Sequence, residues 1–274
     1  MNREESKICA IDTVECINMG RYFLDGKNIY INDLIEQMLE RTKLYRDEPL
    51  YINRAKYENE PKIIFSNKTT TGAANNLVNL YGSRHYKVGV LNFASAKHPG
   101  GGFLRGALAQ EESIARVSTL YPSLVKYPEF YNHNLSLKTS LYSDYIIYSE
   151  GVSIFKDDYG DYLKEPYNID VITSPAPNAG AVRSNEKHNI SKIYPTMENR
   201  IRKIIQVAVL NNIDCLVLGA FGCGVFANNL NDVAEIFRKV LIEEDYQHYF
   251  KVIEFAIYDR NPSTYIEFEE IFRE

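Results

Sequence analysis

Two adjacent glutamates that follow a run of glycines have the residue types and spacing for acid–base chemistry. Residues 98–112 read HPGGGFLRGALAQEE, and Glu111 and Glu112 lie where a helix is expected to begin. Neighbours on a helix point about 100° apart, so one carboxylate can contact a reacting bond while the other holds a hydroxyl. An ordinary charge pair at a helix start, favoured by the macrodipole, is the alternative. A catalytic acid here needs its pKa raised by desolvation, by the neighbouring carboxylate or by an anionic substrate.

The glycines before this pair, Gly100, Gly101 and Gly102, form what we call the first glycine loop. Glycine loses more backbone entropy on folding than any other residue, so three in a row are costly. A backbone without β-carbons can approach a ligand closely and turn its amides inward. A flexible surface loop is the alternative. The position between a buried strand and an acidic helix start favours a binding loop.

A second glycine-rich stretch, GAFGCGVFANN at residues 219–229, also joins an expected strand to an expected helix. Backbone amides at such a step bind phosphate groups. The stretch is neither GxGxxG nor a Walker motif, so the sequence supports neither nicotinamide redox chemistry nor nucleotide-triphosphate hydrolysis. A diphosphate cradle of uncharged amides suits a chain of net charge -5. The second glycine loop consists of Gly222, Cys223, Gly224, Val225 and Phe226.

Four further side chains have two interpretations each. Cys223 has no histidine partner nearby in the sequence, so a small space-filling residue is favoured over a nucleophile. Phe226 could stack on an aromatic base or belong to the core. Asn92 and Ser95 lie at the carboxyl end of a buried strand, where side chains point into the ligand crevice of an open α/β sheet. They are candidate ribose contacts, or caps of the local backbone.

Apolar runs of strand and helix type alternate along the chain, which predicts an α/β sheet covered by helices. The expected strands are 62–67, 87–95, 145–148, 169–174, 214–222 and 251–259. The expected helices are 33–44, 71–81, 110–124 with Pro122 closing it, 195–212 and 231–242. Residues 153–166 read as a hairpin or exposed loop. We expect an accessory segment at 1–60, packed on a catalytic unit at 61–274.

Composition excludes several classes of protein. No apolar run approaches the roughly 20 residues that span a bilayer, and the charged first residues are no secretory signal, so a cytoplasmic protein without membrane contact is expected. The four cysteines and five histidines show no metal-ligand spacing, so neither a metal nor a cofactor is expected. Interspersed charges of both signs argue against general duplex nucleic-acid binding.

The combined motifs resemble those of a known family. GGG, seven residues and QEE resemble the signature of poly(ADP-ribose) glycohydrolases, and GCGVF resembles their diphosphate loop. VLNFASAKHPGGG, QEESIARVSTLYP, VITSPAPNAGAV and FAIYD are similar to the bacterial-type branch of that family, and the resemblance runs from about Asp12 to the carboxyl terminus. It implies a three-layer α/β/α macrodomain with a central mixed sheet and an N-terminal helical accessory segment.

The resemblance also implies roles for the site residues. Glu112 would be catalytic, first as general acid and then as base, while Glu111 and Gln110 hold the ribose being cleaved. The first glycine loop would form the wall beside that ribose, and the second would bind the diphosphate, with Phe226 near the distal ribose or adenine. Asn92 falls where the family orients catalytic groups, and Ser95 where animal members have Asn. Animal members carry Asn-Trp at Ala220 and Phe221, so that contact is not carried over.

The implied activity is hydrolysis of ribose–ribose O-glycosidic bonds in poly(ADP-ribose), mainly from chain ends, because the N-terminal segment of this branch closes over the next ribose. The substrate's own diphosphate would stabilise an oxocarbenium-like state. Poly(ADP-ribose) or ADP-ribosylated protein would be the substrate, ADP-ribose the product, and a monomer with a role in the DNA damage response is expected. The alternatives are an ADP-ribose reader that hydrolyses nothing, and a hydrolase of mono-ADP-ribose on protein or nucleic acid.

Overall fold

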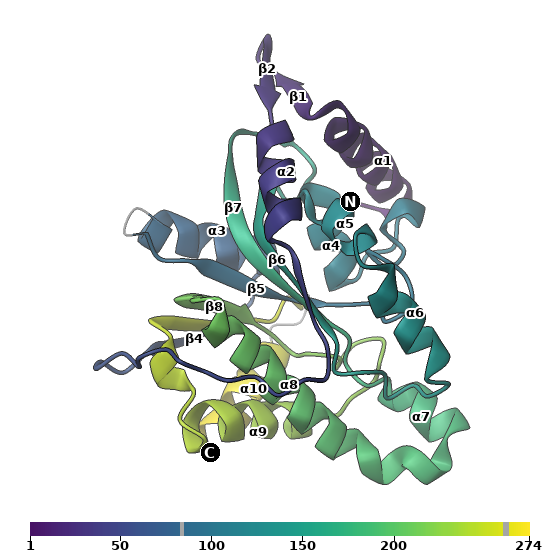
Figure 1. Cartoon of the computed structure of the whole chain (residues 1–274), viewed down its shortest axis with the longest axis vertical. Helices are drawn as coiled ribbons and strands as arrows, with labels where there is room; N and C mark the ends of the chain where they lie inside the picture. The colour runs from purple at the N-terminus through teal and green to yellow at the C-terminus, as the bar shows by residue number, and fades with distance from the viewer. Residues whose placement is uncertain (83–84, 260–262) are drawn as a thin grey trace.

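The computed structural model describes residues 1–82, 85–259 and 263–274, and its centre is a seven-stranded mixed sheet (Figure 1). The strand order is β3-β6-β7-β5-β8-β9-β4. The strands are β3 (Lys43–Tyr45), β4 (Lys62–Ser66), β5 (Val88–Phe93), β6 (Ile146–Lys156), β7 (Tyr162–Ser174), β8 (Cys215–Leu218) and β9 (Val252–Ala256). The five from β7 to β4 are parallel, whereas β6 pairs antiparallel with both β7 and β3. The carboxyl ends of the parallel strands therefore share one edge of the sheet.

Helices cover both faces of the sheet, each with its own hydrophobic core. One core is formed with α8 (Ile193–Leu210), α9 (Leu230–Arg238) and α10 (Ser263–Arg273). The other core is formed with α2 (Asn32–Arg41), α3 (Thr70–Tyr81), α4 (Gln110–Val117), α5 (Leu120–Val125) and α6 (Pro128–Ser136). The predicted three-layer α/β/α architecture is confirmed. Short elements complete the fold: α7 (Ala179–Asn185), the 3-10 turns Phe103–Arg105, Lys187–Lys192 and Gln247–Tyr249, and a π-helical turn at Lys239–Glu243.

The amino-terminal segment consists of α1 (Arg3–Met19), a hairpin of β1 (Arg21–Leu24) and β2 (Lys27–Tyr30), α2 and β3. Its last strand, β3, completes one edge of the main sheet by pairing with β6. The side of α1 that faces the protein is small and polar and consists of Ser6, Ala10, Thr13 and Cys16. Ile8 faces outward and is 61% exposed, whereas Val14 and Ile17 pack against buried apolar residues. Directed hydrogen bonds, such as the one from Thr13 to the carbonyl of Arg116, and apolar contacts therefore both hold α1 in place.

One sequence-based prediction about these elements is wrong, and one pair of alternatives is decided. Pro122 does not close the helix that carries the glutamates: α4 ends at Val117, and Ser118 is extended and bridges to Ile154. Pro122 lies within α5 instead, in its first turn, where its missing N–H costs no helical hydrogen bond. Of the two alternatives for residues 153–166, the hairpin is confirmed, because β6 and β7 continue as paired strands to a tight turn at residues 157–161.

No helix in the described ranges is both long and apolar enough to cross a lipid bilayer.

Candidate active site

A cleft of about 750 Å³ opens at the sheet edge where the parallel strands end. The loops after β4, β5, β8 and β9 and the start of α4 line it. Of the residues predicted from the sequence, the cleft is lined by Ser95, Gln110, Glu111, Glu112, Gly222, Cys223, Gly224, Val225 and Phe226. Asn92 and the first glycine loop do not line the cleft but contact its carboxylates, since Asn92 bonds to Glu111 and Gly102 to Glu112. Segments more than 100 residues apart in the chain thus meet at one site.

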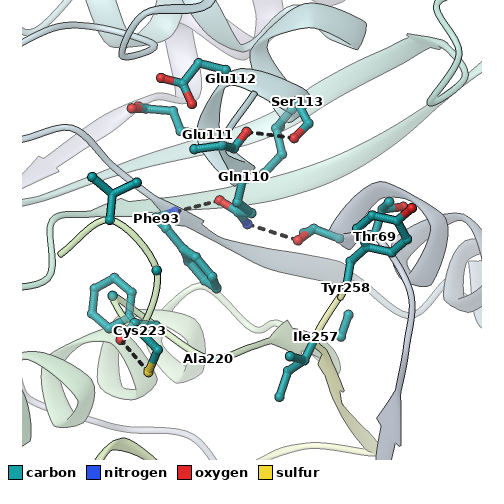
Figure 2. A pocket seen from close by; sticks show the side chains of 18 of the residues that line it. Thr69, Phe93, Gln110, Glu111, Glu112, Ser113, Ala220, Cys223, Ile257 and Tyr258 are labelled. Carbon is teal, nitrogen blue, oxygen red and sulfur yellow. Dashed lines mark hydrogen bonds between the residues drawn. The ribbon is translucent and has the colours of Figure 1, made fainter. Parts of the chain in front are cut away.

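One carboxylate oxygen of Glu112 accepts a hydrogen bond from the protein, and the other has no hydrogen-bond partner among the described residues. Its side chain is buried, and Oε1 accepts a hydrogen bond of 2.8 Å from the backbone N–H of Gly102. Oε2 has no hydrogen-bond partner among the described residues although it is buried. A buried polar oxygen without a partner is costly, so its presence here suggests a group that meets its partner in the substrate. Figure 2 shows the carboxylates of Glu111 and Glu112 side by side at one end of the cleft.

Glu111 is held at both oxygens. Oε2 accepts a 2.7 Å hydrogen bond from the backbone N–H of Ser95, and Oε1 accepts one of 3.3 Å from Nδ2 of Asn92. Burial raises the pKa of Glu111 to about 8, with the Glu112 charge adding to the rise and the Ser95 N–H opposing it. Desolvation and a neighbouring carboxylate are the causes that the sequence argument required. The raised pKa falls on Glu111, the glutamate that was expected to hold the ribose.

The first glycine loop accommodates both carboxylates because it has no side chains. A β-carbon at Gly101 would lie 2.3 Å from Oε1 of Glu112 and 3.0 Å from Oε2 of Glu111. Gly101 and Gly100 also adopt positive φ angles, 60° and 67°, which side-chain-bearing residues rarely adopt. The glycines therefore form the wall against which the two carboxylates pack.

The remaining predicted side chains at this end are already engaged by the protein. Asn92 is fully buried and its Nδ2 bonds to Glu111 and, at 3.2 Å, to Oγ1 of Thr173. Gln110 ties α4 to β5, since its Oε1 accepts from the N–H of Phe93 (Figure 2). Its Nε2 donates to the carbonyl of Leu91. The hydroxyl of Ser95 caps the backbone N–H groups of Lys97 and His98, the local-cap alternative.

The second glycine loop offers backbone donors to the cleft. Within the described structure, the N–H groups of Gly222, Gly224, Val225 and Phe226 donate to no protein acceptor. Consecutive unpaired amides of this kind form an anion-binding nest. The compact turn needs glycine at 222, where φ is 74° and a β-carbon would lie 2.5 Å from that of Ala176. Among the described cleft residues Lys68 supplies the one positive charge, so an anion must be bound mainly by amides.

The thiol of Cys223 is poorly suited to nucleophilic chemistry. Burial raises its pKa to about 12, so it is protonated at neutral pH, and it contacts the carbonyl of Phe221 at 3.8 Å. The space-filling interpretation fits this geometry. Phe226 is partly buried, and its ring centroid lies 6.1 Å from that of Tyr142.

Sequence reasoning missed the other end of the cleft. Residues after β4 and β9 line it, and in Figure 2 Thr69, Ile257 and Tyr258 lie away from the carboxylates, across the cleft. The Tyr258 ring is 67% exposed. The available signal was positional, because these residues follow strands of the parallel sheet just as Ser95 does. No group of three metal-ligating side chains occurs among residues 1–82, 85–259 and 263–274.

A protein-family model, described as the catalytic domain of microbial-type PARG, poly(ADP-ribose) glycohydrolase, matches residues 10–157. The chain matches none of the curated proteins.

Solved structures similar to the chain carry the same name. The poly(ADP-ribose) glycohydrolase of Thermomonospora curvata is 38% identical, with 98% of this chain and 100% of that chain covered and a TM-score of 0.91. The same enzyme bound to the inhibitor ADP-HPD is 37% identical, with 99% of each chain covered and a TM-score of 0.86. The glycohydrolase of Deinococcus radiodurans in complex with ADP-ribose is 35% identical over 92% of this chain and 99% of that chain, with a TM-score of 0.81.

Proposed function

Since the chain belongs to the family of microbial-type poly(ADP-ribose) glycohydrolases, we propose that it hydrolyses ribose–ribose O-glycosidic bonds of poly(ADP-ribose) and releases ADP-ribose, mainly from chain ends. It is a glycosidase with a macrodomain-like fold. Two of the similar solved structures hold an inhibitor or ADP-ribose. We propose that ADP-ribose occupies the cleft of this chain in the same way.

The free oxygen of Glu112 is the observation that carries the proposed mechanism. In the first step, this carboxyl gives its proton to the leaving oxygen while the bond from that oxygen to the anomeric carbon breaks. In the second step, the same group, now a carboxylate, takes a proton from the water that attacks the anomeric carbon. Atoms and charge balance without a second catalytic carboxylate. The Gly102 N–H, which binds Oε1, leaves Oε2 for both transfers.

Glu111 can hold a proton at neutral pH, because burial raises its pKa to about 8. We propose that Glu111 binds the ribose being cleaved, with Asn92 and the Ser95 N–H keeping it in place.

The second glycine loop supports binding of the diphosphate. Four backbone N–H groups without protein acceptors lie in this loop, and the substrate's two phosphates supply acceptors. With the diphosphate beside the anomeric carbon, its negative charge would stabilise the oxocarbenium-like transition state.

The chain-end preference would depend on the amino-terminal segment acting indirectly. No described residue before Lys68 lines the cleft. Instead, α1 braces the back of the segment between the glycines and α4, where Nε of Arg3 donates to the carbonyl of Arg105 at 3.3 Å. Leu108 and Ala109 of that segment do line the cleft. The division into segments 1–60 and 61–274, the monomeric state, the cytoplasmic location and the role in the DNA damage response stay predictions.

Product analysis tests the proposal. The wild-type protein and Glu112→Gln are each mixed with poly(ADP-ribose), and the products are separated by chromatography and identified by mass spectrometry. Free ADP-ribose from the wild type alone is the expected result. If both proteins bind ADP-ribose tightly and neither releases it from the polymer, the chain is a reader or acts on another linkage, and mono-ADP-ribosylated protein and DNA are the next substrates.

A further inference from the structure

The tip of the β6–β7 hairpin contacts the start of α3 through one carboxylate. Asp158 accepts a hydrogen bond of 2.5 Å from Oγ1 of Thr69 at its Oδ2, and another from Oγ1 of Thr71 at its Oδ1. The two segments are almost 90 residues apart in the chain. Each oxygen of Asp158 therefore fixes one threonine, so the side chain holds this turn at two points.

These threonines belong to a wall of the cleft, residues 68–71, which we call the threonine wall. All four residues line the cleft. Thr69 caps α3 by accepting from the N–H of Gly72 at 3.0 Å, and Thr70 accepts from Nε2 of the α4 residue Gln110, also at 3.0 Å. The hydroxyl of Tyr167 in β7 bonds to the carbonyl of Thr71 at 3.2 Å. Asp158 thus adds the contacts that fix the two outer threonine hydroxyls.

The threonine wall and the carboxylates lie at different ends of the cleft. β4, which leads into the wall, is three strands away from β5 in the sheet. With strands about 4.8 Å apart, this corresponds to roughly 14 Å. In Figure 2, Thr69 and Tyr258 lie apart from Glu111 and Glu112. If the ribose to be cleaved lies at the carboxylates, the other half of a dinucleotide-sized ligand reaches this wall.

We infer that Asp158 is a positioning residue for substrate binding: it fixes the threonine wall in the place where it contacts the adenosine half of ADP-ribose. The inference rests on the proposed function. Asp158 itself is exposed on the hairpin and lines no part of the cleft, so it acts through Thr69 and Thr71. Its loss frees two hydroxyl groups and lets Thr69 and Thr71 move, which weakens binding. The bond from Gln110 to Thr70 does not involve Asp158 and continues to hold the start of α4, so the carboxylates stay in place.

Asp158→Ala is the test, with Asp161→Ala as the matched control. Asp161 is an exposed carboxylate of the same turn, and its side chain bonds to no described residue. Calorimetry gives the Kd for ADP-ribose, and steady-state kinetics on poly(ADP-ribose) give KM and kcat separately. For Asp158→Ala we expect Kd and KM to rise about five- to tenfold with kcat within about twofold of wild type. Asp161→Ala should match the wild type in all three.

Two further measurements separate positioning from a general loss of structure. Asp158→Asn keeps one acceptor oxygen, so it should restore part of the affinity. AMP and ribose 5-phosphate serve as probes of the two halves: Asp158→Ala should weaken AMP binding several-fold and leave ribose 5-phosphate unchanged. Unchanged Kd and KM in Asp158→Ala, equal losses for both probes, or the same loss in Asp161→Ala would overturn the inference. A wild-type protein that does not bind ADP-ribose would instead contradict the proposed function.

Discussion

Glu111 and Glu112 pack their carboxylates against the same glycine, Gly101, and differ in how they are held there. Oε2 of Glu111 accepts the Ser95 N–H, whereas Oε2 of Glu112 has no partner in the described part of the chain. The two side chains leave the helix about 100° apart. One turn of α4 therefore presents a carboxylate held by the protein, that of Glu111, and a carboxylate with one oxygen available to a substrate, that of Glu112.

Glu112→Gln should lower kcat by a factor on the order of 10³, because general acid–base catalysis typically supplies 10² to 10⁴ and the amide can neither give nor take the proton. Glutamine keeps the shape and can still accept the Gly102 N–H. ADP-ribose affinity by calorimetry should therefore stay within about threefold of wild type. Turnover close to wild type would refute the role of Glu112.

The stability of the protein should depend on pH through Glu111. Its pKa is 4.5 in the unfolded chain and about 8 in the folded protein, so between these values the folded state binds more protons. The free energy of unfolding therefore falls as pH rises through this window and levels off above it. Denaturant unfolding at several pH values should show the wild type losing on the order of 3 kcal/mol relative to Glu111→Gln between pH 5 and 8.5. Parallel curves for the two proteins would show that Glu111 keeps an ordinary pKa.

Gly101→Ala should abolish most activity. The new β-carbon would collide with Oε1 of Glu112, and φ at this position is 60°. Gly26→Ala is the control, because Gly26 has a φ of 78° and open space around it, so it measures the backbone strain alone, about 1 kcal/mol. We expect a loss of kcat of at least about 100-fold in Gly101→Ala, with unchanged kcat in Gly26→Ala. Equal activities in the two variants would mean that the close approach is unimportant.

The thiol of Cys223 should react slowly with alkylating reagents. Because burial raises the pKa of its thiol to about 12, the reactive thiolate is scarce at neutral pH. Iodoacetamide at pH 7.5 should label Cys223 far more slowly than a free thiol, as followed by peptide mass spectrometry. Cys223→Ala should keep kcat within about twofold. Rapid labelling that inactivates the protein would contradict this expectation.

Lys156 should couple the amino-terminal helix to activity. Its buried ammonium donates to the Cys9 carbonyl, to Asp12 at 2.6 Å and to Thr13 at 2.8 Å, and Thr13 also bonds the carbonyl of Arg116 at the end of α4. Lys156→Met should cost about 2 kcal/mol in denaturant unfolding, less than a fully buried pair because Asp12 is 44% exposed. It should also lower kcat several-fold. Lys164→Met, at an exposed lysine, is the control. Equal losses of stability and kcat in the two variants would contradict a specific role for Lys156.

The sequence predicted the site best where its functional residues lie close together in the chain. The glycines at 100–102 and the pair at 111–112 lie within 13 residues of the chain, so their proximity could be predicted from spacing. The strands that were missed or predicted too short depend on contacts between distant parts of the chain. β6 and β7 pass through polar residues such as Lys156 and Tyr162, which are satisfied by α1, more than 140 residues away in the chain. Such partners follow from tertiary contacts and cannot be read from local patterns.

The hydrogen-bond partners of single polar side chains also could not be predicted from the sequence. Gln110 has all its hydrogen bonds within the protein, and Ser95 caps its own loop, although both lie where ligand contacts were expected. Position in the chain predicted which residues approach the cleft, but not where each donor and acceptor points. The threonine wall shows the converse, since nothing in NKTTT predicts that an aspartate almost 90 residues away holds it.

The polar inner side of α1 constrains how this protein can vary. Thr13, Cys9 and Asp12 reach their partners through directed hydrogen bonds, and a one-residue insertion or deletion between them and the end of α1 would rotate each by about 100° around the helix. A helix docked by apolar contacts alone can slip and repack, whereas these directed bonds accept a single rotation of the helix. Its outward residues, such as Ile8 and Ile11, are free to change type. The number of residues in α1 is therefore held more strictly than their identity.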